Sequence, residues 1–434
     1  MTDWRALVLE EVDAGTPELF ALLAELVATP SIGGAEAEDA IQGRLAAELA
    51  SEGLDVDHWE LPLDELMAAD DFPGVEVERS RASGLVGRLA GTDPGAPTLM
   101  LNGHVDVVPP GDLDAWSADP FSGRICGGTL YGRGACDMKA GLVSALGAVR
   151  AIRRVGVPLA GDLLLACVPG EEDGGLGTYG LLRRGWRADA CVVPEPTGLD
   201  LVPATAGALT FRLRVPGRAT HASRRTEGVS AIAKFLPVWH ALARLEEHRN
   251  RHVDPLMRRW PIAYPLSIGR ISAGDWASSV PDRLLAEGRL GVALDEPVEA
   301  ARAALEAAVA EACAEDPWLR AHPVGVEWWG GQFAPGRLPA PSDLAARVAR
   351  AHADVGGGPQ ETWGAPYGSD LRLLTGLGGI PTLHYGPGDA ALAHAPDESV
   401  PLAEVVTAAR ALAVLALDIC GPGQMPAVSR IQPR

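Results

Sequence analysis

Three short apolar runs, each followed by side chains that can bind a metal ion, constrain this chain most. The runs cover residues 98–101, 162–168 and 190–193. Apolar residues then recur at helical spacing at Leu142, Leu146 and Val149, and strand, turn and helix alternate as far as residue 194. This alternation predicts an α/β fold with a mostly parallel sheet covered by helices. In such sheets, ligands bind at the carboxyl ends of the strands.

The first run leads into His104 and Asp106. On an extended backbone, two side chains at this spacing point to the same face. A metal-bound imidazole usually donates its second N–H to a carboxylate, so we predict that His104 is a ligand and that Asp106 orients it. Asp137, within the sequence GRGACDMK, would be the next ligand. An isolated H-x-D triplet more often marks a turn or a solvated strand end, so this prediction depends on the other two runs.

The second and third runs end in carboxylates. Glu171 and Glu172 are adjacent after the second run, and Glu195 follows the third. Far along the chain, the sequence LAHAPDE adds His394. Imidazole and carboxylate groups are common ligands of zinc. The sequence therefore places candidate ligands at the ends of three predicted strands.

These motifs, in this order, resemble the M20 family of metallopeptidases and deacylases over nearly the whole chain. The resemblance implies a site with two divalent metal ions, of which zinc is the expected one. It implies that Asp137 bridges the ions, that His104 and Glu195 complete one site, and that Glu172 and His394 complete the other. Cobalt and manganese tolerate the same ligands, so the residues alone do not select the metal.

The resemblance also assigns the proton transfer. It implies that Glu171, next to a ligand but not a ligand itself, is the general base. It further implies a cis peptide bond between Asp137 and Met138, which is rare for a residue other than proline.

From residue 208 onward the pattern becomes strictly alternating, as in a half-exposed antiparallel strand. The elements that follow predict the order βαββαβ of a ferredoxin-like unit. We therefore predict an α+β lid and dimerisation domain inserted into a zinc-hydrolase catalytic domain. The predicted boundaries are residues 1–205 and 331–434 for the catalytic domain and residues 206–330 for the lid.

His221 lies in a polar turn just after the first strand of the predicted lid. A single histidine in such a turn is usually a surface residue. The family resemblance instead implies that His221 reaches the active site of the other subunit and stabilises the tetrahedral intermediate. It thereby also predicts a homodimer formed through the lid.

The sequence YGSDLRLL resembles the family's segment that binds a substrate carboxylate. Arg372 would bind it, because a guanidinium matches a carboxylate bidentately. The alternative is that Arg372 pairs with Asp370 and only holds the loop. The backbone N–H groups of Gly386 and Gly388 would form an anion nest beside it.

Two positions of the predicted lid depart from the family's pattern. Ser278 stands where many members have asparagine, and Gly291 stands where a basic residue is usual. Arg289, two positions earlier on the same strand face, is the candidate replacement for binding substrate. These departures affect the expected acyl or carboxylate specificity and leave the metal ligands intact.

The net charge of −20 argues against a nucleic acid or an anionic membrane as partner, because both would be repelled. The start of the sequence has acidic residues where a signal peptide needs basic ones. No uncharged run approaches the length of a membrane span. The six cysteines form no C-x-x-C pair. We therefore expect a cytoplasmic protein with reduced thiols.

The leading functional prediction is metal-dependent hydrolysis of the amide bond of a small N-acyl amino acid or a related N-acylated amine. Within the same chemistry, the alternative is a dipeptidase or carboxypeptidase acting on a short peptide. A metal-binding partner protein without catalysis is a remote alternative, because it predicts loss of the base or of a ligand. All five ligands and Glu171 are present.

Overall fold

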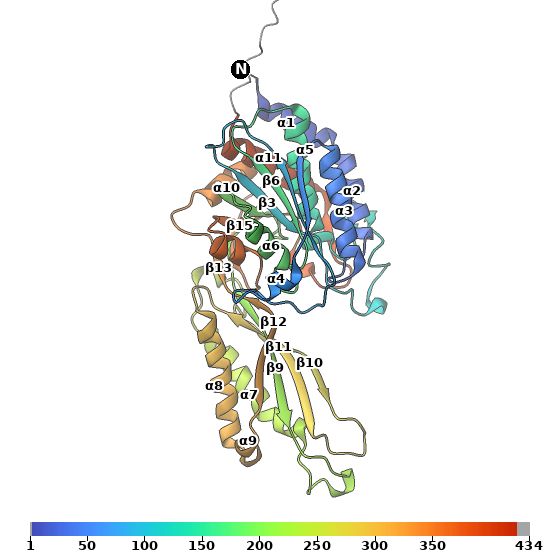
Figure 1. Ribbon diagram of the computed structural model, residues 1–434, viewed down its shortest axis with the longest axis vertical. Coiled ribbons are helices and arrows are strands. Elements are labelled where there is room, and N and C mark those ends of the chain that lie inside the picture. Colours follow the sequence, from blue (N-terminus) through green and yellow to red (C-terminus); the bar gives the residue numbers. More distant parts are fainter. Residues whose placement is uncertain (1, 423–434) are drawn as a thin grey trace, which may run out of the picture.

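The computed structural model describes residues 2–422 and has two lobes (Figure 1). The larger lobe contains a nine-stranded mixed sheet with helices packed on it. The smaller lobe contains a four-stranded antiparallel sheet with two long helices. This architecture confirms the predicted α/β class with an inserted α+β unit.

The large sheet has the strand order β1, β2, β6, β3, β7, β15, β8 and β13, with β14 paired to β8. Its centre is parallel, because β3 pairs in parallel with both β6 and β7, and β7 with β15. The strands are β1 Asp55–Glu60, β2 Ser83–Leu89, β3 Leu99–His104, β6 Leu163–Val168, β7 Ala190–Val193, β8 Leu201–Thr205, β13 Gly336–Arg337, β14 Thr362–Ala365 and β15 Thr382–His384.

Both faces of this sheet are apolar, as expected for a parallel sheet that helices cover. Along β3, Leu99 and Leu101 join the larger core cluster, while Met100 joins a second cluster on the opposite face. The larger cluster lies beneath α1 Trp4–Ala14, α2 Thr16–Ala28, α3 Glu36–Ser51, α5 Ala140–Val155, α10 Leu344–Asp354 and α11 Leu402–Cys420. The second cluster lies beneath α4 Leu63–Met67 and α6 Leu176–Arg184.

The beginning of α5 lies directly against the end of β7. A Cβ atom on Gly141 would be only 1.7 Å from the carbonyl oxygen of Pro194, so no other residue fits there without a backbone shift. This close approach sets the turn that carries Asp137 beside the segment that carries Glu195.

The lid is the lower lobe of Figure 1. Its sheet has the order β10, β11, β9, β12, and every pair is antiparallel. Apolar residues of this sheet pack against α7 and α8, and this order of strands is that of a ferredoxin-like unit. The elements are β9 Gly207–Pro216, α7 Ala231–Arg249, β10 Leu266–Ala273, β11 Arg283–Val292, α8 Val298–Glu315, α9 Pro317–Ala321 and β12 Gly325–Phe333.

The predicted end of the lid at residue 330 falls inside β12. The register of β12 against β9 shifts between Trp328 and Gln332, so the strand continues past an irregularity to Phe333. The sheet of the lid therefore ends three residues later than predicted, and the chain rejoins the large sheet at β13.

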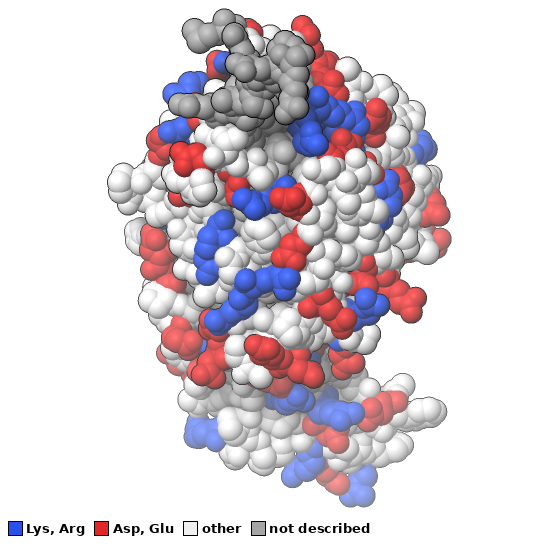
Figure 2. All heavy atoms as spheres, turned by 45° about the horizontal axis from the view of Figure 1, so that its top comes forward, with Lys and Arg blue, Asp and Glu red and all other residues white. Residues whose placement is uncertain are grey.

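A separate third sheet has three short strands. It consists of β16 Ser399–Pro401, β5 Thr129–Tyr131 and β4 Arg124–Cys126. No helix within the described residues 2–422 is long and apolar enough to cross a membrane. On the face shown in Figure 2, basic side chains are interspersed with acidic ones.

Candidate metal centre

Three adjacent strands end at the site. His104 is the last residue of β3, Glu171 and Glu172 follow β6, and Glu195 follows β7. Because β6, β3 and β7 are parallel neighbours, their carboxyl ends meet at one edge of the sheet. The predicted positions at the strand ends thus converge, as the alternation of strands and helices indicated.

Asp137 and His394 come from segments that the small third sheet brings together. The strand β5 precedes the turn that holds Asp137, and β16 follows the loop that holds His394. These two strands pair antiparallel, from Tyr131 with Ser399 to Thr129 with Pro401. The pairing joins two parts of the sequence that the whole lid separates.

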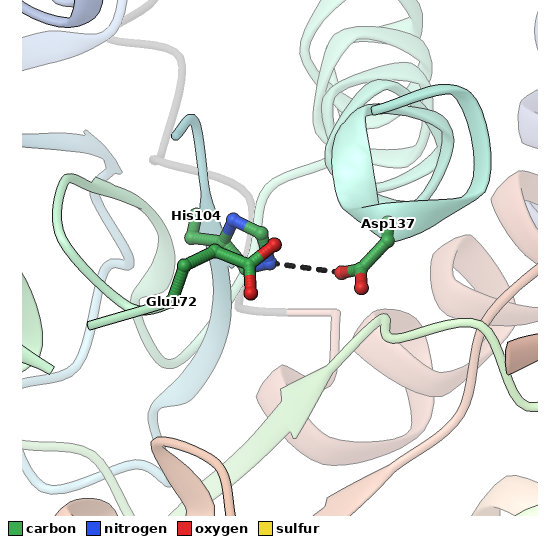
Figure 3. Close-up of side chains that lie close together, drawn as sticks. All are labelled: His104, Asp137 and Glu172. Atoms are coloured by element: carbon green, nitrogen blue, oxygen red, sulfur yellow. Dashed lines mark hydrogen bonds and ion pairs between the residues drawn. The ribbon is translucent and has the colours of Figure 1, made fainter. Parts of the chain in front are cut away.

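The two oxygens of Asp137 face different histidines. Oδ1 lies 3.1 Å from Nε2 of His104, and Oδ2 lies 3.6 Å from Nε2 of His394. Glu195 Oε1 is 3.9 Å from His104 Nε2, and Glu172 Oε2 is 3.1 Å from His394 Nε2. Figure 3 shows Asp137, His104 and Glu172, which offer ligand atoms within 4.8 Å of one another.

His104 is oriented by a different atom from the one predicted. Its Nδ1 lies 2.9 Å from the backbone oxygen of Asp106 and 3.6 Å from the carboxylate of the same residue. A carbonyl oxygen only accepts, so Nδ1 carries a proton and Nε2 faces Asp137. The Asp106 carboxylate instead accepts the backbone N–H groups of Glu171 and Glu172, at 3.2 and 3.1 Å. Asp106 therefore positions two strand ends at once.

Several carboxyl groups are buried together here. Burial raises the pKa of Glu171 and that of Glu195 well above the usual range, and the neighbouring carboxylates Asp370 and Asp137, respectively, raise them further. Burial alone would lower the pKa of His104, but its hydrogen bond to Asp137 and nearby carboxylates raise it instead. Such a concentration of buried acids is costly unless a cation is bound among them.

Glu398 holds the turn that carries Asp137, and sequence analysis did not identify it. One carboxylate oxygen accepts the N–H groups of Cys136 and Asp137, at 3.0 and 3.1 Å. The other oxygen is 2.6 Å from Nη1 of the buried Arg133. The signal was the last letter of LAHAPDE, four positions after His394. The peptide bond between Asp137 and Met138 is cis, as the family resemblance implied.

A pocket of about 500 Å³ opens over these groups, within the usual range for a small-molecule site. Besides Glu171 and the candidate ligands other than His104, it is lined by Arg289 and Phe333 of the lid and by Tyr367. Glu76, from a segment with no assigned role, also lines it.

Arg372 is not among the residues that line this pocket. Its guanidinium is buried and donates to the backbone oxygens of Ser369 and Gly174, at 2.8 and 2.7 Å. It also stacks on Phe333, with 4.1 Å to the ring centroid, and lies 4.0 Å from Asp370. The described contacts therefore match the alternative in which Arg372 holds its loop.

The predicted anion nest is wrong for this structure. The N–H of Gly386 donates to Thr197 Oγ1 at 3.1 Å, and the N–H of Gly388 donates to a carboxylate oxygen of Glu404 at 2.8 Å. Both donors are already satisfied by the protein, so they cannot hold a substrate anion without breaking those bonds.

His221 lies in the lid with an exposed side chain and does not line the pocket of its own chain. Its Nδ1 accepts the N–H of Ser223 at 3.2 Å, which leaves the proton of a neutral ring on Nε2. The backbone oxygen of Ser278 accepts the N–H of Ala222 at 2.8 Å. Ser278 thus supports the turn of His221 through its backbone.

Comparison with known proteins decides the family. The model of peptidase family M20/M25/M40 matches residues 100–418. The chain belongs to this family. Membership confirms the predicted family and the prediction of a hydrolase.

Two relatives and one solved structure place the chain further. An N-formyl-4-amino-5-aminomethyl-2-methylpyrimidine deformylase from Bacillus subtilis is 30% identical over 85% of this chain and 86% of the relative. The enzyme of the same description from Halalkalibacterium halodurans is 27% identical over 95% and 97%. Human carnosine dipeptidase 1 has the same fold, with a TM-score of 0.75 at 16% identity over 96% of this chain and 99% of that one.

Proposed function

We propose that this M20 hydrolase removes a small acyl group, such as formyl, from an N-acylated amine. One observation carries the metal-dependent part of the proposal. The two oxygens of Asp137 face two separate pairs, His104 with Glu195 and Glu172 with His394, as a carboxylate shared by two ions requires.

The donor set suits two divalent ions of the zinc type. It consists of imidazole nitrogens and carboxylate oxygens, which zinc, cobalt and manganese all accept. When bound, such ions would polarise the scissile carbonyl and lower the pKa of a bound water molecule. The carboxylates of the centre are costly to bury without a cation, and they supply the negative charge that these ions need.

Glu171 is the proposed proton carrier. It lines the pocket, and Asp106 fixes its backbone by accepting its N–H. Its carboxylate takes a proton from the attacking water and gives it to the nitrogen of the leaving amine as the C–N bond breaks. Burial raises the pKa of the Glu171 carboxyl, as suits a group that must hold the proton before returning it.

The relatives favour an acylated amine over a peptide as substrate. The two deformylases are 27 and 30% identical over 95 and 85% of the chain, whereas the dipeptidase shares the fold at 16% identity. The dipeptidase or carboxypeptidase reading is therefore the second candidate, and a direct comparison of substrates separates the two.

We also propose a homodimer formed through the lid. Ile232, Leu236 and Trp239 recur at helical spacing on α7 and are 49, 54 and 43% exposed. The sheet of the lid also ends in β10, whose outer edge pairs with no strand among the described residues. A second lid would cover both features. The Nε2 proton of His221 would then be a donor for the oxyanion in the partner's site.

The test of the function is a turnover screen of the zinc- or cobalt-loaded protein. N-formyl and N-acetyl derivatives of an aminomethyl heteroaromatic amine are compared with N-succinyl amino acids and dipeptides. We expect release of the free amine from the N-formyl substrate, two metal ions per chain by elemental analysis, and loss of turnover on chelation. Faster cleavage of dipeptides would favour the second candidate, and full activity in verified metal-free protein would reject the metal site.

The dimer is tested by mixing two inactive variants, His221→Ala and Glu171→Gln. A mixed dimer has one site with both an intact base and an intact partner histidine, so activity should return in part. Mass spectrometry confirms subunit exchange. Absence of rescue despite exchange would show that His221 does not act across subunits.

A further inference from the structure

Glu76 joins three parts of the molecule. Its segment is anchored to the loop of the catalytic base, because Asp173 Oδ2 accepts the N–H groups of Glu76 and Val77, both at 3.0 Å. Asp173 is itself held by the buried Arg79, with two hydrogen bonds of 2.9 Å. The segment also abuts the lid, since a Cβ on Gly74 would lie 2.0 Å from the backbone oxygen of Gly330. The position of Glu76 is therefore fixed from both sides.

All the described hydrogen bonds of the Glu76 carboxylate go to one oxygen. Oε1 accepts from Thr210 Oγ1 at 2.7 Å, from Arg289 Nη2 at 3.1 Å and from the N–H of Gly331 at 3.3 Å. Oε2 has no partner among the described residues, and the side chain is 27% exposed where it lines the pocket. One oxygen thus ties the lid in place while the other is open to a ligand.

The guanidinium of Arg289, which lines the pocket, is already paired with Glu76. Among the described lining residues, Arg289 is the one lysine or arginine. It lies between Glu76 and the ring of Phe333, with 5.4 Å to the ring centroid. A substrate carboxylate that approached Arg289 would meet the negative charge of Glu76 at the same place. An amine or amidine would instead find an open acceptor.

From this geometry we infer that Glu76 is a specificity-determining residue that selects substrates with N–H donors or positive charge, and no carboxylate, on the part that meets the lid. This rests on the proposed function, because it names the part of an N-acylated amine that the lid side of the pocket binds. An amine or amidine would form a charge-assisted hydrogen bond with Oε2, because Oε1 already accepts three hydrogen bonds.

The test compares two probes of the same size and shape, benzamidine and benzoate, by calorimetric binding to the zinc-loaded enzyme. The isosteric Glu76→Gln variant removes the charge and releases Arg289. We expect the ratio of the benzamidine and benzoate affinities to fall roughly 10- to 100-fold, the range of one charged hydrogen bond. Any binding of benzoate to the metal ions is common to both proteins and cancels from the comparison.

Thr210→Val is the matched control, since it removes a hydrogen bond to the same oxygen without changing charge. It should leave the ratio within twofold. If Glu76→Gln also left the ratio within twofold, or weakened both probes equally as a loosened lid would, the specificity role would be rejected. Both outcomes are independent of turnover. An inactive wild type would therefore reject the proposed function and leave this measurement valid.

The same three proteins can be assayed with an N-formyl aminomethyl-aminopyridine and an N-formyl amino acid. In the wild type we expect the first substrate to have the higher kcat/KM. In Glu76→Gln the preference should shift towards the carboxylate by a similar factor. Thr210→Val should keep the wild-type preference.

Discussion

Charged side chains are arranged differently on the lid sheet and at the strand ends of the catalytic domain. On the lid, Arg214 on β9 pairs with Glu327 on the neighbouring strand β12 at 2.7 Å, with 60 and 41% of the two side chains exposed. At the strand ends of the catalytic domain, the acids Glu171 and Glu195 are buried, and neighbouring carboxylates raise the pKa of each. The lid could lose this exposed pair at little cost, whereas the proposed metal centre depends on cations that the chain does not itself provide.

The largest predicted effect is the loss of kcat when the general base Glu171 is replaced. Glu171→Gln should lower kcat by roughly 10²- to 10⁴-fold and leave both metal ions bound, because an amide cannot accept the proton but the ligands are untouched. Steady-state kinetics with elemental analysis tests this. Glu172→Gln is the control that should lose metal. Normal turnover in Glu171→Gln would show that the proton leaves by another route.

Removal of the metal should affect one lobe alone. A ligand present at about a thousand times its Kd stabilises the folded state by about 4 kcal/mol, and this stabilisation disappears on chelation. Hydrogen exchange of the turn at residues 132–139 should accelerate, while exchange in β9 and β11 stays unchanged. Equal acceleration in both lobes would contradict the view that the buried charge is confined to the catalytic domain.

The buried His384 should make the free energy of unfolding depend on pH, an effect of intermediate size. It is fully buried, and burial lowers the pKa of its ring to about 3, with Nε2 3.0 Å from Ser369 Oγ. The unfolded chain binds a proton below its pKa of about 6.5, whereas the folded protein does not until near pH 3, so the free energy of unfolding falls as pH falls through this window. At pH 5 the loss should be about 2 kcal/mol.

Chemical denaturation at pH 7 and pH 5 measures this loss. His384→Gln should reduce the pH dependence of stability by about one proton. The exposed His240 on α7 provides the control, since His240→Gln should leave the pH dependence unchanged. An unchanged slope in His384→Gln would mean that other groups cause the acid sensitivity.

The smallest effect is expected on the lid sheet. Glu327→Gln should change the melting temperature only slightly, and the difference should shrink in high salt, because exposed ion pairs are weak and screened. Thermal unfolding at low and high salt tests it. A larger, salt-independent loss would show that the lid also depends on buried charge.

Much of the site followed from the sequence because local patterns determine it. A residue at the end of an apolar run must lie at the edge of the sheet, so His104, Glu172 and Glu195 could be placed without a structure. The role of Glu76 could not be predicted, because its segment is irregular and its position depends on Asp173 and the lid.

Arg372 shows a second limit of prediction from the sequence. The sequence gives its neighbour Asp370 but not the two backbone oxygens that take its N–H groups, since Gly174 lies far away in the chain. Likewise, adjacency identified Asp106 as the partner of His104 but could not tell its carbonyl from its carboxylate.

The link between Glu398 and the turn of Asp137 has a consequence for synthesis on the ribosome. The lid is continuous in sequence, so all of its residues have been made once residue 333 has emerged. The turn of Asp137 instead depends on a carboxylate made more than two hundred residues later. During translation the nascent chain therefore passes through a stage in which the whole lid sequence is present and the centre cannot yet be assembled. Contacts between such distant residues also slow folding.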